Sequence, residues 1–172
     1  LPEDYDADEP DKLDLRTPGD HLIQEAKIYE ILEQHPHPNI YVYCGCVRDG
    51  DYVTDIYLKK YGRTLMHAVW KGDTTLNPAT ILDGISKGLH FLHETLGLVH
   101  NDMNLANIML DDAGHPVIID FDFCIPIGEE IGISSKAGTF GWTMGPMPTM
   151  ALPENDIYGP TQIGEFMKGK RS

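Results

Sequence analysis

The chain has 172 residues and a formal net charge of -14, because 27 aspartates and glutamates outnumber 13 lysines and arginines. A chain of this length can bury one hydrophobic core, and its hydrophobic content of 41% is typical of a globular protein, which excludes general disorder. The negative charge argues against nucleic acids and anionic membranes as partners, since both prefer positively charged surfaces.

The first 16 residues are expected to form a flexible lead-in. Within 1–14, seven acidic side chains accompany a single lysine and two prolines, a composition that disfavours a packed core. A helix should then begin with Thr17 as N-cap and Pro18 in its first turn. Apolar residues recur at helical spacing after this point, and the prolines at 36 and 38 should end the helix.

Two strands are predicted at 40–47 and 52–58, because both segments are rich in β-branched and aromatic residues and a D-G pair separates them. Cys44 and Cys46 alternate on the first strand, where we expect buried free thiols. Together with Cys124 they show neither zinc spacing nor a disulfide framework. No signal peptide or membrane-spanning run is recognised, so we expect a reducing, cytoplasmic location.

Two helices should follow the strands. A short helix is expected over 64–71, and a longer one begins at Asn77, a residue type that commonly caps helices. Apolar residues at intervals of three and four continue this longer helix until Gly97, a typical C-terminal stop. His90 and His93 lie i, i+3 on it, but without an obvious third ligand a structural role is favoured over a metal site.

The most distinctive stretch runs from His100 to Asn107, with Asp120 following shortly afterwards. Between Asn107 and Asp120, two apolar runs flank the polar turn 111–114, which predicts a short hairpin. Asp102 and Asn107 would enter this hairpin and Asp120 would leave it, so three oxygen-bearing side chains should gather at one end. Two carboxylates and an amide oxygen suit a hard cation such as Mg²⁺.

The pattern H-N-D-x4-N, followed after an apolar strand by an aspartate, resembles the catalytic loop and metal-binding aspartate of the protein-kinase-like superfamily. The resemblance implies an α+β, protein-kinase-like fold with a reduced N-terminal lobe, made of a helix and a β-hairpin, and a shortened helical C-terminal lobe. One kinase-like domain is expected over 17–172, with a partial small lobe at 17–61 and a partial large lobe at 62–172. No glycine-rich loop and no V-A-I-K-like strand is recognisable before the first helix, as in a truncated or minimal kinase domain.

The resemblance also implies roles for residues in the distinctive stretch. Asp102 would accept the proton of the substrate hydroxyl, and Asn107 and Asp120 would hold Mg²⁺ on the phosphates of ATP. His100 would orient the loop through packing and hydrogen bonds. Met109 would form the floor beneath the adenine.

Further nucleotide-binding residues are implied upstream. Leu58 would occupy the gatekeeper position, and backbone groups of Lys59 and Tyr61 would meet the adenine edge. Glu25 would pair with a strand lysine, with Glu30 as the second choice. A solvated helix face is the alternative interpretation of this glutamate.

Three positions depart from the kinase pattern. Asn101 replaces the usual arginine, which argues against control by an activation-loop phosphate. Asn104 stands where serine/threonine kinases keep a lysine, and H-N-D also resembles choline and aminoglycoside kinases, which phosphorylate small molecules. Asp122 replaces the glycine of D-F-G and adds a third carboxylate.

Two segments further along fit the same family. Gly138 and Thr139, followed by Trp142, resemble the G-T-x-x-Y/W of protein kinases. Asp156 resembles the residue that opens the helix supporting the catalytic loop, where it would hydrogen-bond to backbone.

The sequence leaves three functions open. The leading one is ATP- and Mg²⁺-dependent phosphotransfer, with a nucleotide and a protein hydroxyl or small-molecule acceptor as partners, and with a partner chain that could complete the small lobe. The absence of a recognisable glycine-rich loop and lysine favours a catalytically inactive pseudokinase that acts as a binding or scaffold module. The third is a kinase-like scaffold that performs other acid–base chemistry on a small metabolite.

Overall fold

The computed structural model describes residues 18–132 and 138–169. The lead-in predicted for 1–16 and the Thr17 cap lie outside these residues. Within them the chain forms helices and small antiparallel sheets, which confirms the predicted α+β class.

A helix and a hairpin form the N-terminal part, as predicted. Helix α1 (Pro18–Gln34) ends before the prolines, and strands β1 (Tyr43–Asp49) and β2 (Tyr52–Leu58) pair antiparallel. The second strand has the predicted bounds, whereas the first begins at 43 instead of 40 and ends at 49 instead of 47. The rings of Tyr29 and Tyr43 stack with their centroids 5.7 Å apart, which packs the helix against one face of the hairpin.

A β-bulge interrupts the alternation of side chains on β1. The register shifts between Tyr43 and Gly45, and Gly45 adopts a φ of 126°, which a side chain would make unfavourable. Cys44 is exposed and Cys46 is half-buried, so the expectation that both thiols are buried was wrong. The expectation failed because a bulge inserts an extra residue into one strand and breaks the period of two.

The next part of the chain is helical. Helix α2 (Leu65–Trp70) is capped by Thr64, whose hydroxyl accepts a backbone N–H at 3.1 Å. Helix α3 (Pro78–His90) is capped by Asn77, as predicted, whose side-chain oxygen accepts a backbone N–H at 3.1 Å. A π-helical turn at Phe91–Thr95 extends α3 towards the predicted stop.

Short antiparallel strands surround the distinctive stretch. The predicted hairpin is present, with β5 (Ile108–Leu110) paired to β6 (Pro116–Ile118), and the carboxylate of Asp111 accepts two N–H groups of the turn at 2.8 and 2.9 Å. The outer pairs join β3 (Arg63–Thr64) to β5 and β4 (Leu98–Val99) to β7 (Ile125–Pro126). Strand β4 thus lies immediately before His100, and β5 begins immediately after Asn107.

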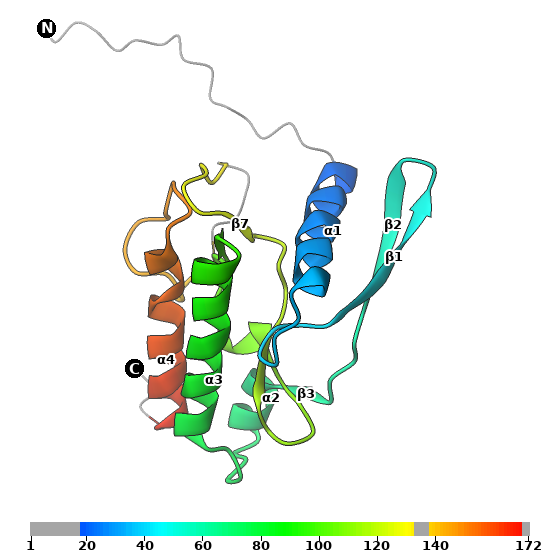
Figure 1. Ribbon diagram of the computed structural model, residues 1–172. Coiled ribbons are helices and arrows are strands. Elements are labelled where there is room, and N and C mark those ends of the chain that lie inside the picture. Colours follow the sequence, from blue (N-terminus) through cyan, green and yellow to red (C-terminus); the bar gives the residue numbers. More distant parts are fainter. Residues whose placement is uncertain (1–17, 133–137, 170–172) are drawn as a thin grey trace, which may run out of the picture.

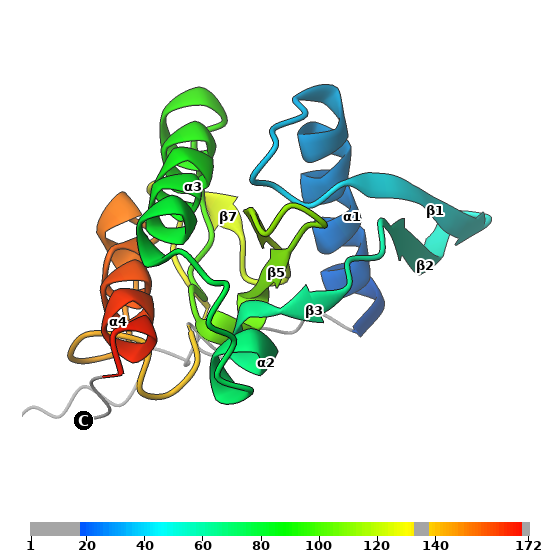
Figure 2. The same ribbon diagram turned by 90° about the horizontal axis from the view of Figure 1, so that it is seen from below.

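One hydrophobic core joins the two parts of the molecule. In Figure 1, α3 and helix α4 (Tyr158–Met167) stand side by side, and α1 with its hairpin forms the opposite side. Figure 2 shows β3 and β5 between them. Buried side chains from the four α-helices and from the segment after β6 meet in the core, among them Tyr29, Leu65, Ile85, Phe121 and Ile163. No helix within the described residues is both long and apolar enough to cross a membrane.

Helix α3 packs closely against β6 because it carries glycine at the contact. A Cβ added to Gly84 would lie 2.5 Å from Cγ of Pro116, which belongs to a stiff ring. We expect Gly84→Ala to lower the free energy of unfolding, measured in urea, by about 1–3 kcal/mol, the usual cost of overpacking. Gly62→Ala is the matched control, since its Cβ would meet nothing within 4 Å. Equal stability of the two variants would contradict the packing argument.

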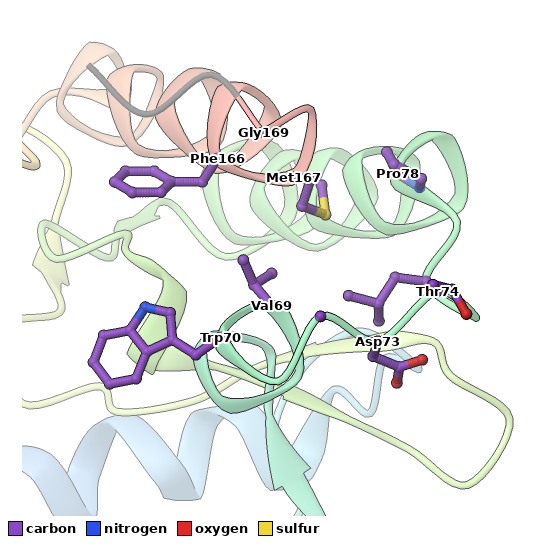
Figure 3. Close-up of a pocket in the computed structure, with 10 residues that line it drawn as sticks. Val69, Trp70, Asp73, Thr74, Pro78, Phe166, Met167 and Gly169 are labelled. Atoms are coloured by element: carbon purple, nitrogen blue, oxygen red, sulfur yellow. The ribbon is translucent and has the colours of Figure 1, made fainter.

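A groove of about 490 Å³ opens between the ends of α2 and α4, as Figure 3 shows. Val69 and Trp70 line it from α2, and Phe166 and Met167 line it from α4. These helices do not carry the predicted site residues. The groove is therefore separate from the candidate active site.

Candidate active site

One buried carboxylate anchors the loop that carries the predicted catalytic residues. Asp156 accepts hydrogen bonds from the backbone N–H groups of His100 and Asn101, both at 2.8 Å. Nε2 of His93 lies 2.8 Å from Oδ2 of the same carboxylate. These contacts confirm the backbone bonds predicted for Asp156 and give His93 a structural role.

The helix after Asp156 approaches the loop closely. Asp156 ends a 3₁₀ helix (Pro153–Asp156), and Gly159 follows in the first turn of α4. A Cβ on Gly159 would collide with the carbonyl oxygen of Met103. Glycine at this position therefore lets α4 support the loop by direct contact.

The ring of His100 lies fully buried between the loop and the strand that leads to Asp120. Its Nδ1 accepts the N–H of Asp102 at 3.3 Å, and its Nε2 lies 2.9 Å from the carbonyl oxygen of Ile119. A ring that accepts at Nδ1 carries its proton at Nε2, so Nε2 donates to Ile119. The ring also meets Phe121 edge-on, with centroids 5.1 Å apart. His100 thus connects the backbone of Asp102 to the residues on either side of Asp120.

Asp102 and Asn107 are joined directly. Nδ2 of Asn107 donates to Oδ2 of Asp102 at 2.9 Å and to its backbone carbonyl at 2.8 Å. Because both bonds use the amide nitrogen, the amide oxygen of Asn107 is available as a ligand. Oδ1 of Asp102 accepts from the Asn104 side chain at 3.2 Å and from the N–H and hydroxyl of Thr139, both at 2.8 Å. These bonds fix the orientation of the carboxylate.

Three carboxyl groups gather where α1 meets the segment after β6. Asp120 adopts a φ of 62°, and Asp122 is hydrogen-bonded to Glu25 of α1. Burial, followed by the charge of Asp122, raises the pKa of Asp120. Burial, followed by the bond and charge of Asp122, raises the pKa of Glu25 to about 8. Such a cluster of carboxyl groups is a favourable environment for a cation, whose positive charge would lower their pKa values.

The two glutamates proposed to pair with a strand lysine have other neighbours. Glu25 lies beside the aspartates, whereas Glu30 pairs with Arg48 of β1 at 3.0 Å. Within residues 18–132 and 138–169, neither glutamate forms an ion pair with a lysine. Glu25 therefore lies among carboxyl groups, close to the candidate metal ligand Asp120.

The raised pKa of Glu25 predicts a pH dependence of stability in Mg²⁺-free buffer. A carboxyl whose pKa is about 8 when folded and 4.5 ordinarily stabilises the fold fully below about 4.5. This contribution is lost as the pH rises through about 8, and because Glu25 is only half-buried, solvent screening keeps the loss well below the single-proton limit of about 1.4 kcal/mol per pH unit. Glu25→Gln should remove this loss, so that urea unfolding shows the variant to be more stable than the wild type at pH 8.5 but not at pH 4.5.

A second substitution on the same helix tests that expectation. Glu33 is exposed on α1, and Glu33→Gln should leave the pH dependence of unfolding unchanged. The same pH dependence of unfolding in Glu25→Gln and in the wild type would contradict the raised pKa of Glu25.

The residues predicted to contact adenine follow β2 and lie on β5. Leu58 ends β2 and Met109 is the middle residue of β5, and both are half-buried. The backbone N–H of Lys59 donates to the carbonyl of Val42 at 2.9 Å. The backbone carbonyl of Lys59, and not its N–H, is therefore the group that could contact an adenine. The ammonium of Lys59 lies 5.2 Å from the centroid of the Tyr61 ring.

Asn107 and Asp120 are the side chains whose chemistry fits Mg²⁺. Magnesium prefers oxygen ligands and is commonly bound by one or two protein side chains, with phosphates and waters completing its octahedron. In the part of the chain that the structure describes, no three His, Cys, Asp or Glu side chains are arranged to hold a metal. An amide oxygen and a carboxylate beside further negative charge therefore suit a cation that arrives with a nucleotide.

Two contributors to the site were not assigned from the sequence. Thr139 bonds to Asp102, and the G-T-x-x-W pattern was its only signal. Asn155 donates to Oδ1 of Asn101 at 3.0 Å, and nothing in the sequence distinguishes it from an ordinary loop asparagine.

The sequence is similar to those of known proteins. The sequence model of the protein kinase domain matches residues 7–147. A probable leucine-rich repeat receptor-like serine/threonine-protein kinase of Arabidopsis thaliana is 32% identical over 116 residues, which are 62% of this chain and 11% of that protein. Cysteine-rich receptor-like protein kinase 41 of the same plant is 34% identical over 103 residues, 54% of this chain and 15% of that protein. The chain thus spans a small part of these relatives' length.

A solved structure shares the fold. A chain in the crystal structure of the yeast RNA Pol II CTD kinase CTDK-1 complex superposes with a TM-score of 0.68 at 16% identity. The superposition covers 86% of this chain and 51% of that chain. At this identity it shows the fold alone, and it confirms the protein-kinase-like arrangement of a helix and hairpin followed by a helical part.

Proposed function

The chain belongs to the protein kinase domain family, and from this we propose that it transfers a phosphoryl group from ATP to a hydroxyl acceptor with Mg²⁺. Asp102 is the proposed general base, and Asn107 and Asp120 are the proposed Mg²⁺ ligands. Bound Mg·ATP would supply the transferable phosphoryl group with its charge partly neutralised. The protein's own residues would position the acceptor hydroxyl and take its proton.

The bond between Asn107 and Asp102 is the observation that carries this proposal. It ties the carboxylate that would accept the proton to the amide whose oxygen would bind the metal, at 2.9 Å. A general base must lie within hydrogen-bond reach of the proton it takes, and fixed geometry lowers the entropic cost of reaching that arrangement. The bonds of His100 to Asp102 and Ile119 support the same arrangement from the other side.

The acceptor is proposed to be a protein or small-molecule hydroxyl. The side-chain oxygen of Asn104 accepts the N–H groups of Ala106 and Asn107 at 2.9 and 3.2 Å. Asn104 thus caps the short turn that leads to Asn107. This structural role supports an acceptor site that works without the lysine that serine/threonine kinases keep at position 104. The names of the plant relatives support a protein hydroxyl.

A partner chain and a reducing setting belong to the same proposal. Among the described residues the β1–β2 sheet has two strands, and sheets of two strands are marginal by themselves, which supports a partner that adds to the small lobe. The free cysteines support a reducing, cytoplasmic environment.

Binding without phosphotransfer is a second candidate function. It is favoured by Thr139, whose N–H and hydroxyl both occupy Oδ1 of Asp102. Within the described residues Glu25 lies beside aspartates and pairs with no lysine, which favours this function as well.

Calorimetry followed by a transfer assay separates the two functions. Mg²⁺ with a non-hydrolysable ATP analogue would be titrated into the protein, and labelled ATP would then be offered with protein and small-molecule hydroxyl acceptors. Binding with transfer supports the phosphotransferase, and binding without transfer supports the second function. The absence of binding at millimolar ligand would exclude the phosphotransferase.

A further inference from the structure

We infer that Asn101 is a positioning residue whose neutral side chain clamps the segment after Asp120 to the catalytic loop, with no phosphate needed. The clamp would hold the two proposed Mg²⁺ ligands, Asn107 and Asp120, in a constant relative position. The expected effect of Asn101 on ligand binding rests on the proposed function. The restraint that its side chain places on the segment after Asp120 can be measured without any ligand.

Asn101 connects three segments that are distant in the sequence. Its backbone N–H donates to Asp156 at 2.8 Å, and its side-chain oxygen accepts from Asn155 at 3.0 Å. Its Nδ2 donates to the carbonyl of Phe123 at 3.0 Å and more weakly to that of Val99 at 3.4 Å. Only 4% of the residue is exposed, so these bonds are made where water competes little.

The bond to Phe123 reaches the metal-binding side. Phe123 follows Asp120 closely, and the next residue, Cys124, is buried and donates its N–H to the carbonyl of Phe121 at 3.1 Å. Asp120 itself adopts a φ of 62°, a conformation that non-glycine residues keep only when their surroundings hold it. Fixing the carbonyl of Phe123 therefore restrains the backbone that carries Asp120.

The chemistry of the position selects an amide. Asn101 adopts a φ of 64°, which asparagine tolerates better than most residues. A carboxylate would repel the two carbonyl oxygens, and a buried cation would need a compensating charge. Among the described residues, Arg48 forms an ion pair with Glu30 and Arg63 forms one with Asp73. Neither of these ion pairs involves a residue of the catalytic loop.

Cys124 provides a readout of the clamp that needs no ligand. Cys124 directly follows Phe123 and only 1% of the residue is exposed, whereas Cys44 is exposed and serves as an internal reference. Losing a buried hydrogen bond while leaving its partner unsatisfied should raise the rate of local opening about tenfold. We therefore expect Asn101→Ala to accelerate alkylation of Cys124 by iodoacetamide by that factor relative to Cys44, as measured by peptide mass spectrometry.

Asn39 supplies the matched control. It is also a buried asparagine, and its Nδ2 donates to the backbone carbonyl of Pro116 at 2.9 Å, away from the loop. Both variants would be labelled at urea concentrations that give them equal free energies of unfolding. Equal acceleration of Cys124 labelling in Asn39→Ala and Asn101→Ala would overturn the clamp.

Ligand affinity separates the clamp from the proposed function. Asn101→Ala should weaken binding of Mg²⁺ with a non-hydrolysable ATP analogue about tenfold, and Asn39→Ala should leave this affinity unchanged. Equal binding by the wild type and Asn101→Ala would overturn the positioning role. If the wild type does not bind while Cys124 opens in Asn101→Ala alone, the clamp holds and the proposed function fails.

Phosphatase treatment tests the independence from phosphate. Treated wild-type protein should keep both its Cys124 labelling rate and its ligand affinity. A change in either quantity would show that the amide alone does not hold the segment.

Discussion

Asp156→Ala is expected to lower the free energy of unfolding by about 3–5 kcal/mol, the usual cost of removing one member of a buried charged network. The fully buried carboxylate accepts the N–H groups of His100 and Asn101 and contacts His93. The substitution would leave these donors without a partner in a place that water does not reach. Urea unfolding followed by circular dichroism measures the loss.

An exposed aspartate provides the control for that experiment. Asp83 forms a surface ion pair with Lys87, and Asp83→Ala should change the unfolding free energy by less than about 1 kcal/mol. Asp156→Asn keeps the shape but turns an NH₂ group towards one of the donors, so its loss should be large as well. Similar stabilities of Asp156→Ala and Asp83→Ala would mean that the anchor contributes little.

Asp102→Asn is expected to slow phosphoryl transfer by a factor of about 10²–10⁴, the range usual for removal of a general base. The amide matches the carboxylate in shape but does not take up a proton at neutral pH. The affinity for Mg²⁺ with a non-hydrolysable ATP analogue should fall by a much smaller factor than the rate, because Asn107 and Asp120 are the proposed ligands and the new NH₂ group only weakens the contact with Asn107 or Thr139. Rate and affinity would be measured on the same preparations.

Two further variants sharpen the result. Asp120→Asn should instead raise the Mg²⁺ concentration needed for half-maximal binding, since a neutral amide attracts the cation less than a carboxylate does. Asp112→Asn, in the exposed turn between β5 and β6, should change neither rate nor affinity. Transfer by Asp102→Asn at the wild-type rate would show that Asp102 is not the base.

Local patterns in the sequence were sufficient to predict most elements. Several of these patterns extend over only a few residues, so they can be recognised without tertiary contacts. They are the apolar stripe of α1 and the prolines that follow it, the Asn77 cap of α3, and the turn between β5 and β6. The H-N-D-x4-N pattern identified the loop by its spacing. The anchoring role of Asp156 followed from the same family template.

Other features required the tertiary structure. The bulge at Gly45 exposes Cys44, although strand alternation predicted burial, because alternation cannot reveal an inserted residue. The bonds of Thr139 to Asp102 and of Asn155 to Asn101 join residues that are far apart in the chain. Their partners depend on how the loop after β7 returns to the site.

The sequence by itself determined the family resemblance, the order of the elements and the identity of the polar residues at the site. The tertiary structure alone decided the environment of those residues. It brought Glu25 against Asp122 and occupied both oxygens of Asp102. The physical reason is that residue spacing is a local property, whereas burial, charge neighbours and hydrogen-bond partners arise only when distant segments pack together.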